Sequence, residues 1–393
     1  MRAVSARTLL AAATLFLVGL NLRAAMTALG PVLPEIMQAT GLSSGGAGVL
    51  TTVPVLCLGL LAGFAPPLAR RLGADRALLA LMLLLAAGCL LRLSGGVGAL
   101  IASGTIVGAA IGMGNVLMPG MVKRDFAEHP ALMTGIYTMA MCVSAAVGTA
   151  LSVPLANWLG GWPAGIAAWA APALLAALAL LLAGPRAGAG APGRLAAVPG
   201  LWRNRLAWTI TVSMGMQSTI TYTLFTWLPP LLRERGMDPI DAGLVAALSS
   251  VTQMVSSLIA PTLATRARDQ RFAIPVLLSI GFVGFLIARD GPLHLAWVGT
   301  VLMGLGQGGT FAVSLMLIVL RSPDARVAAQ LSSMAQSVGY TITGLGPMLV
   351  GLAHDMVGNW SMLTPLIAVV TVVGALAGYG AGRDRTLPRA GGA

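Results

Sequence analysis

The sequence predicts an all-α membrane protein with twelve transmembrane helices in two pseudo-symmetric six-helix bundles, and three observations support this. Hydrophobic residues make up 57% of the 393 residues and charged residues only 9%, whereas soluble proteins carry about 25% charged residues. The chain divides into about twelve apolar segments, and about 20 residues suffice to cross a bilayer. The second half of the chain also repeats positions of the first half.

The apolar segments are separated by short turns, and we expect membrane-spanning helices at 8–34, 46–69, 76–94, 97–120, 131–157, 163–183, 206–230, 242–265, 272–288, 293–319, 328–352 and 361–381. The one longer connection, 184–205, is rich in Gly, Pro and Arg. We therefore expect an N-terminal six-helix bundle over 1–184, a cytoplasmic linker over 185–205 and a C-terminal six-helix bundle over 206–393. The start of the chain resembles a signal peptide, but its apolar run continues to Pro34, which favours an uncleaved first helix.

The basic residues predict the orientation, because cytoplasmic loops are enriched in Lys and Arg. With the N-terminus inside, nineteen of the 24 basic residues fall on the cytoplasmic side, and four fall outside: Arg92, Arg233, Arg235 and Arg289. The predicted location is a bacterial inner membrane, with both termini in the cytoplasm. The net charge of +12 is spread over small clusters between apolar runs, which argues against nucleic acid as a partner.

An internal repeat relates the two halves. A shift of 195 residues superposes Leu33-Pro34 on Leu228-Pro229, Gly41 on Gly236, Pro66 on Pro261 and Arg71 on Arg266. A parallel repeat of six plus six helices is the architecture of two-half secondary transporters, whose substrate site lies between the halves near the bilayer midplane.

Arg23 is the one charged residue between Leu9 and Pro34. A guanidinium stays protonated at physiological pH, and at the bilayer centre it costs at least about 2.5–3.5 kcal/mol. We expect it to face the cavity between the halves, on one helix face with Thr27, and to bind an anion or an electronegative group. The alternative is a structural tie to backbone carbonyls within the N-terminal half.

Two motifs carry a resemblance to a known family. One is Asn21-Leu22-Arg23 with Thr27 and Gly30-Pro31-Val32-Leu33-Pro34, and the other is Gly114-Asn115-Val116-Leu117-Met118-Pro119 followed by Lys123-Arg124-Asp125-Phe126. With these motifs the chain resembles the major facilitator superfamily over essentially its full length, and more narrowly its cyanate/2-nitroimidazole permease branch. The resemblance implies a transporter of a small anion or small polar heterocycle that works by alternating access.

The loop between the second and third helices departs from the superfamily pattern. Pro67 stands at the position of the usual acid, so the acidic partner of the basic residues is either Asp75 or Asp125. The residues expected to form the cytoplasmic gating group are Arg70, Arg71, Asp75, Lys123, Arg124 and Asp125.

The second half offers neutral polar groups where the first offers a cation. The repeat places Ser218 and Tyr222 at the positions of Arg23 and Thr27. We expect the substrate to contact Arg23 and Thr27 together with polar residues of other helices: Asn115, Gln217, Tyr222, Gln253, Gln307 and Tyr340. The alternative for the polar side chains is hydrogen bonding between helices, which is common in membranes.

None of the twelve acidic residues lies at the centre of a predicted span, although membrane carboxylates commonly relay protons. Glu35 and Asp355, at outer helix ends, are the nearest candidates for coupling to a proton. The three cysteines lie inside apolar runs at no metal-ligand spacing, and no phosphate-binding loop or catalytic motif is present. We therefore expect neither an enzyme nor a cofactor.

Three functions compete at this point. The leading hypothesis is a monomeric transporter of a small molecule that is anionic or electronegative, working with a coupled proton or as a facilitated uniporter. The second is a multidrug or toxic-compound exporter of the same fold, for which the absence of embedded acids disfavours cationic drugs. The third is a non-transporting membrane sensor, which the lack of any sizeable soluble segment disfavours.

Overall fold

The computed structural model describes residues 6–126, 128, 130–184, 200–267 and 269–387. These residues form α-helices and short 3-10 helices without any strand. Most of the expected linker, 185–199, lies outside the described residues.

The N-terminal half contains six helical spans, several of them interrupted. In chain order they are α1 (Ala6–Asn21), α2 (Ala24–Thr27), η1 (Gly30–Val32) and α3 (Leu33–Thr40); α4 (Ser44–Leu60), η2 (Ala62–Phe64) and α5 (Ala65–Leu72); α6 (Ala74–Leu90) and η3 (Leu91–Ser94); α7 (Val97–Asp125); α8 (Pro130–Trp158); and α9 (Trp162–Ala167) and α10 (Ala170–Ala183).

The C-terminal half repeats this plan with fewer interruptions. It consists of η4 (Leu201–Arg203) and α11 (Arg205–Glu234); α12 (Pro239–Ala264); α13 (Ala273–Asp290); η5 (Leu293–Leu295) and α14 (Ala296–Leu320); α15 (Ala325–Val357); and η6 (Trp360–Met362) and α16 (Leu363–Ala381). Each α-helix overlaps one of the membrane-spanning segments expected from the sequence, whereas η4 lies in the expected linker.

Within the described residues, ten stretches are long and apolar enough to cross a membrane. α11 and α15 are not among these ten, although they have 30 and 33 residues. Their sequences are rich in Ser, Thr and Gln. α11 is buried along most of its length and packs on η1 of the N-terminal half, and α15 packs on α4 of that half, although Leu345, Leu349 and Leu352 of α15 are exposed. The polarity of these two spans is therefore explained by their position.

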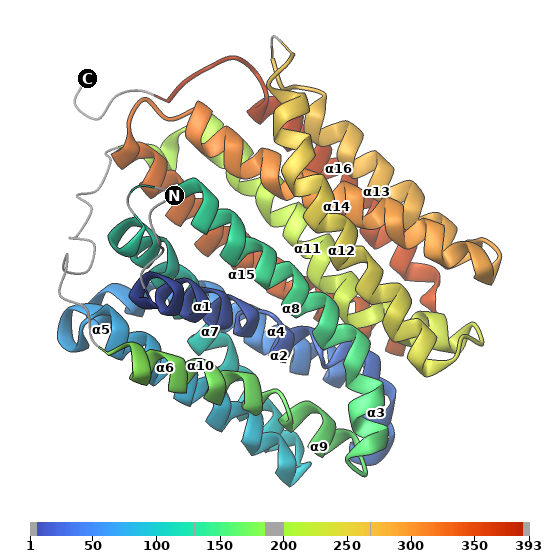
Figure 1. Ribbon diagram of the computed structural model, residues 1–393. Coiled ribbons are helices and arrows are strands. Elements are labelled where there is room, and N and C mark those ends of the chain that lie inside the picture. The colour runs from blue at the N-terminus through green and yellow to red at the C-terminus, as the bar shows by residue number, and fades with distance from the viewer. Residues whose placement is uncertain (1–5, 127, 129, 185–199, 268, 388–393) are drawn as a thin grey trace.

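Each half has its own hydrophobic core. One core is built around buried residues of α1, α6, α7 and α10, and the other around buried residues of α11 to α16. Figure 1 shows the two halves side by side, with α1 beginning and α16 ending at the same end of the bundle. We call this the terminal end, and we call the end that carries α3 and α9 the far end.

Glycines allow the closest helix packing. Gly104, Gly108 and Gly112 of α7 face α4, and a Cβ at Gly108 would lie only 2.2 Å from the carbonyl oxygen of Pro54. In α14, a Cβ at Gly308 would lie 2.1 Å from the carbonyl oxygen of Gln253 on α12. Glycine stripes of this kind let membrane helices approach backbone to backbone. Gly108 and Gly308 therefore both serve close helix packing.

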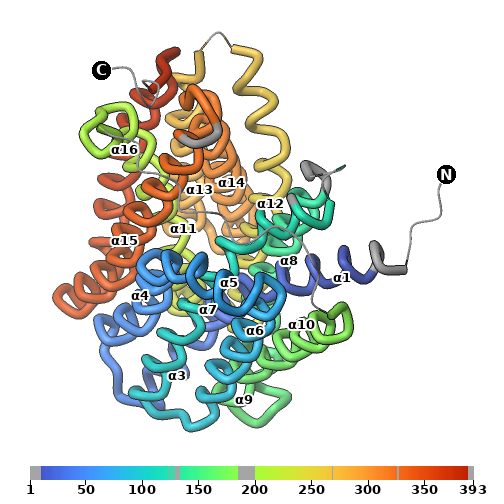
Figure 2. Tube along the Cα trace, turned by 90° about the vertical axis from the view of Figure 1, so that its left-hand side faces the viewer, coloured from blue at the N-terminus to red at the C-terminus, as the bar shows by residue number. Residues whose placement is uncertain are grey.

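The halves meet through two helix pairs, α4 against α15 and α8 against α12 (Figures 1 and 2). Toward the far end η1 also packs on α11, and glycines allow close contacts there. A Cβ at Gly30 would lie 2.2 Å from the carbonyl oxygen of Phe225, and one at Gly351 would lie 2.2 Å from that of Ser44. The backbones of the two halves are thus in direct contact near the far end.

Candidate functional site

The first span is broken at Arg23, which a continuous helix over 8–34 does not predict. α1 ends at Asn21, and α2 begins at Ala24 after a turn in which Arg23 has φ −142° and ψ −36°. The break removes the helical partner of the Ala24 N–H, which instead donates to the hydroxyl of Ser144 on α8 at 2.8 Å. A second interruption follows at Gly30-Pro31, where the proline and the close approach of α11 account for the 3-10 turn.

Arg23 is half-buried, and its guanidinium makes no hydrogen bond or ion pair with any residue that the structure describes. It lies close enough to interact electrostatically with Tyr222 of α11, Cys142 of α8 and Tyr340 of α15. The rings of Tyr222 and Tyr340 pack edge to face, with centroids 6.3 Å apart. A cation of the N-terminal half therefore lies beside two aromatic residues of the C-terminal half.

Thr27 and Tyr222 line a small cavity between the halves. α2, η1 and α4 contribute its N-terminal wall and α11 its C-terminal wall, and about 20 Å³ of it is open to the centre of a water molecule, enough for about one water. The Thr27 hydroxyl itself donates to the carbonyl oxygen of Ala145 at 3.2 Å. Thr27 thus ties α2 to α8, and its hydroxyl is already engaged.

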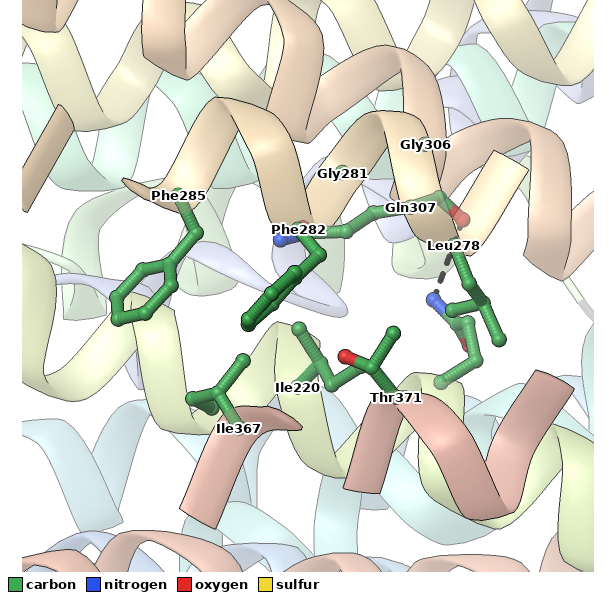
Figure 3. Close-up of a pocket in the computed structure, with 10 residues that line it drawn as sticks. Ile220, Leu278, Gly281, Phe282, Phe285, Gly306, Gln307, Ile367 and Thr371 are labelled. Carbon is green, nitrogen blue, oxygen red and sulfur yellow. Dashed lines mark hydrogen bonds between the residues drawn. The ribbon is translucent and has the colours of Figure 1, made fainter. Parts of the chain in front are cut away.

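The three predicted glutamines lie together in a separate cluster inside the C-terminal half. Gln253 Nε2 donates to Gln307 Oε1 at 3.1 Å, and Gln217 Nε2 donates to the Gln307 carbonyl oxygen at 3.2 Å and to Thr221 at 2.9 Å. Gln307 borders a gap between α11, α13, α14 and α16 whose other walls are mainly apolar (Figure 3). About 10 Å³ of this gap is open to a water centre, at the lower limit for holding one water, so the cluster has the geometry of hydrogen bonding between helices.

The two asparagines of the resemblance motifs differ in their contacts. Asn21 is buried and donates to the carbonyl oxygens of Leu17 and Pro172, at 2.8 and 3.0 Å, so it joins α1 to α10. Asn115 is half-buried on α7, and no described contact brings its side chain to Arg23.

The charged residues at the terminal end form an ion-pair group within the N-terminal half. Arg124 binds both oxygens of Asp75 at 2.7 and 2.8 Å and also pairs with Asp125 at 2.6 Å. Hydrogen bonds with Asp125, and then with Asp75, raise the pKa of Arg124 above its ordinary value. Both acids that the sequence left as alternatives therefore share one arginine, which joins the start of α6 to the end of α7.

Two other members of the expected gating group lie outside this ion-pair group. Arg70 and Arg71 are exposed at the end of α5. The side chain of Lys123 lies outside the described residues.

A matching group in the C-terminal half was not singled out by the sequence. Arg321, at the end of α14, is buried and donates to Gln270 and to the carbonyl oxygens of Ala381 and Gly382. Burial lowers the pKa of Arg321, and Asp384 and Asp269 partly offset this effect. The repeat shift of 195 places Gln270 at the position of Asp75. The second half thus has a neutral partner at this position, and Arg321 pairs with the carboxylate of Asp384 instead, at 3.5 Å.

Glu35 and Asp355 both bridge the halves at the far end. Glu35 of α3 pairs with Arg233 of α11 through both oxygens, at 2.7 and 2.8 Å. Asp355 of α15 accepts hydrogen bonds from the backbone N–H groups of Ser44 and Gly45 at the start of α4, at 2.8 and 2.7 Å. We call these two carboxylates and their partners the far-end clamp.

The pKa of Asp355 follows from these contacts. Burial raises it, but hydrogen bonds from the Ser43 hydroxyl and from the N–H groups of Gly45 and Ser44 outweigh burial, so the pKa lies below its ordinary value of 3.8. Asp355 is therefore ionised at physiological pH in this conformation.

Arg92 is the important buried cation that loop counting misplaced. The sequence assigned it to an outer loop, but it is only 2% exposed, because the 3-10 turn η3 folds it inward. Its guanidinium donates to Ser103 at 2.9 Å, to the Ala25 carbonyl at 2.9 Å and to the Ile166 carbonyl at 3.4 Å. Arg92 thus plays the structural role that was the alternative for Arg23.

Comparisons with known proteins agree with this architecture. The family model of the Major Facilitator Superfamily matches residues 15–347. The chain belongs to the Major Facilitator Superfamily. In keeping with this family, it is a multi-pass membrane transporter of a small molecule and not an enzyme.

Individual relatives are similar along most of their length. The uncharacterized transporter YycB of Bacillus subtilis (strain 168) is 38% identical, over 94% of this chain and 92% of that one. The 2-nitroimidazole transporter of Escherichia coli (strain K12) is 35% identical, over 95% and 96%. The cyanate transport protein CynX of the same organism is 31% identical, over 88% and 91%.

A solved structure shares the fold. The inward-facing, unoccupied structure of a bacterial homolog to the human lysosomal transporter Spinster superposes with a TM-score of 0.80, over 98% of this chain and 100% of that one. Their sequences are 16% identical, so this likeness concerns the superfamily fold alone.

Proposed function

We propose that this transporter carries a small monoanion, or a small planar heterocycle with an electronegative edge, across a bacterial inner membrane by alternating access. The observation that carries the proposal is the guanidinium of Arg23, which is half-buried and unpaired among the described residues. An unpaired cation between two membrane bundles is costly, and a bound anion offsets that cost.

The surroundings of Arg23 suit a small flat ligand. A guanidinium presents several N–H donors in a planar fork, which matches carboxylate-like or nitro oxygens. The aromatic rings of Tyr222 and Tyr340 supply flat walls from the other half. A ligand held by Arg23 and these rings contacts both halves at once, which is the arrangement that alternating access requires.

The relatives support the same chemistry. Cyanate is a linear monoanion, and 2-nitroimidazole is a planar heterocycle with two nitro oxygens. Both are small enough to lie against one guanidinium. We therefore propose a substrate of this size and polarity, without assigning either compound to this chain.

The orientation and oligomeric state belong to the same proposal. The excess of basic residues in the loops of the terminal end supports cytoplasmic termini. The site is formed by the two halves of one chain, so a monomer contains all of its parts.

A ligand-induced stability shift tests the proposal. The purified protein is heated with cyanate, nitrate, nitrite, simple carboxylates or 2-nitroimidazole, because a ligand that binds only the folded state raises its apparent stability. At a hundred times its Kd, such a ligand contributes about 2.7 kcal/mol.

Arg23→Gln should remove most of that shift. Loss of one partner of a desolvated charge pair costs about 3 kcal/mol, which weakens binding about 150-fold. At the same ligand concentration the stabilisation should then fall to about 0.3 kcal/mol. An unchanged shift in Arg23→Gln refutes the binding role of Arg23. Arg266→Gln, which removes an exposed charge at the end of α12, is the control and should keep the full shift.

A further inference from the structure

We propose that the transporter is an obligate exchanger of monoanions. It converts rapidly between its two access states when an anion is bound to Arg23, and only slowly when the site is empty. The inference rests on the proposed function and adds to it the mode of transport. It replaces proton coupling, for which the sequence offered only Glu35 and Asp355.

The first step is the charge of the empty site. The described residues near Arg23 supply no compensating carboxylate, and every acidic residue of the chain lies at a helix end or in a loop. Tyrosine hydroxyls are neutral at physiological pH. The hydroxyls of Thr27 and Ser144 are already engaged with Ala145 and Ala24. The empty site therefore carries one net positive charge.

Arg92 shows what a permanently enclosed guanidinium requires in this fold. It is buried in the same half and is held by one hydroxyl and two carbonyl oxygens. Arg23 has no comparable set of acceptors among the described residues, and it is less buried. Arg92 can remain enclosed without a ligand, whereas Arg23 lacks the groups that would permit this.

The second step is the path between the two access states. The halves touch at the far end through Gly30 and Phe225, and the far-end clamp joins them there. Access from that end requires these contacts to separate while the terminal end closes, and the site is enclosed by protein in between. Enclosing a bare guanidinium leaves a charge without water or partner, which is strongly unfavourable. Enclosing a guanidinium paired with a monoanion leaves a neutral pair.

The third step is the consequence for flux. The empty transporter has the higher barrier between the two access states, so conversion of the empty transporter back to the starting side limits net transport. Exchange of one anion for another avoids this step. The same balance selects the charge of the cargo, because a dianion leaves a net negative charge and a cation doubles the positive one. A weakly acidic heterocycle should accordingly be exchanged in its deprotonated form.

Radiotracer flux tests the inference. The purified full-length protein is reconstituted in liposomes, with the membrane potential clamped by potassium and valinomycin. Uptake of labelled cyanate, nitrate, benzoate and 2-nitroimidazole is measured into vesicles loaded with the same unlabelled compound and into vesicles loaded with gluconate. We expect uptake into the preloaded vesicles to be about a hundredfold faster, corresponding to about 2.7 kcal/mol in the barrier.

The outcomes separate the two proposals. Equal initial rates with and without internal anion overturn exchange but leave anion transport standing. Rapid net uptake driven by an inward proton gradient also overturns exchange. Absence of protein-dependent flux for every compound overturns the proposed function, and exchange falls with it.

A conformational measurement assigns the barrier to Arg23. The three native cysteines are replaced by serine, and fluorophores are attached at Ala39→Cys and Ser361→Cys, two exposed positions at the far end in opposite halves. Single-molecule energy transfer then reports opening of this end. In the otherwise native chain, switching should accelerate about a hundredfold when the transported anion is added, which is about 2.7 kcal/mol.

The variants give opposite expectations. Arg23→Gln should switch rapidly without anion and should not respond to it, because its empty site is neutral. Arg23→Lys should remain slow without anion, and Arg266→Gln should behave as the native chain. Slow switching in Arg23→Gln, or fast anion-independent switching in the native chain, refutes the inference.

Discussion

The far-end clamp makes a quantitative prediction about the balance between the two access states. Glu35→Gln and Asp355→Asn each remove one carboxylate that joins the halves, without changing the shape of the side chain. Both contacts exist only when the far end is closed. The two substitutions should therefore destabilise the closed far end and leave the fold of each half intact.

The magnitude follows from the geometry of each contact. The side chains of Arg233 and Glu35 are 19% and 35% exposed. Exposed ion pairs contribute about 0.2–1 kcal/mol, and the two-oxygen geometry of this pair places it near about 1 kcal/mol. Asp355 satisfies two otherwise unpaired N–H groups at the start of α4, and loss of such a cap costs about 1 kcal/mol.

The two sites share no partner, so their effects should add. The free energy that favours the closed over the open far end should thus fall by about 2 kcal/mol in the double variant, which raises the ratio of open to closed molecules about thirtyfold. Each single variant should raise it about fivefold.

The assay uses the fluorophore pair at Ala39→Cys and Ser361→Cys, and the ratio of open to closed molecules is read from the populations. Asp290→Asn is the matched control. It removes a carboxylate from the same end, but Asp290 pairs with Arg289 of its own half and is 57% exposed. An unchanged population in the double variant, or an equal change in Asp290→Asn, refutes the assignment of the clamp.

Three further outcomes are expected. The pKa of Asp355 is below its ordinary value, so the stabilisation of the closed far end by this carboxylate is complete above about pH 4 and is lost only as the pH falls below that. The population of molecules with a closed far end should therefore not change between pH 8 and 5.5, and a loss of closed molecules near pH 6 contradicts this. Gly108→Ala, with its Cβ 2.2 Å from the Pro54 carbonyl, should lower the unfolding free energy in detergent by about 1–3 kcal/mol, whereas Gly120→Ala on the same helix, with nothing within 4 Å, should be neutral or slightly stabilising. Arg92→Gln should lower the free energy of unfolding by about 2 kcal/mol, because it leaves buried carbonyl and hydroxyl acceptors unpaired. An unchanged melting temperature would argue against the structural role of Arg92.

Much of the fold could be predicted from composition and periodicity. A lipid environment requires long apolar helices, so the twelve segments could be located to within a few residues. The repeat at a shift of 195 identified the two halves because related bundles keep Pro, Gly and Arg at corresponding turns.

The candidate site was less accessible to the same reasoning. The cost of a lone charge in an apolar segment singled out Arg23, and the repeat placed Tyr222 opposite it. The hydrogen bonding of Gln217, Gln253 and Gln307 to one another and their neighbours could not be foreseen, because it depends on the rotation of three separate helices. Nor could the inward turn that buries Arg92, because a loop arginine and a folded-back arginine look alike in sequence.

The sequence by itself determined that the chain is a two-bundle membrane protein and that its first apolar span contains a single cation. The reason is that burial in lipid constrains every residue of a span, and these constraints are local and periodic. Only the tertiary structure decided that Arg92 has hydrogen-bond acceptors whereas Arg23 has none among the described residues, and that Glu35 and Asp355 join the halves at the far end. Whether a charge finds a partner depends on contacts between residues far apart in the chain, such as Asp355 with Ser44, and no local pattern encodes them.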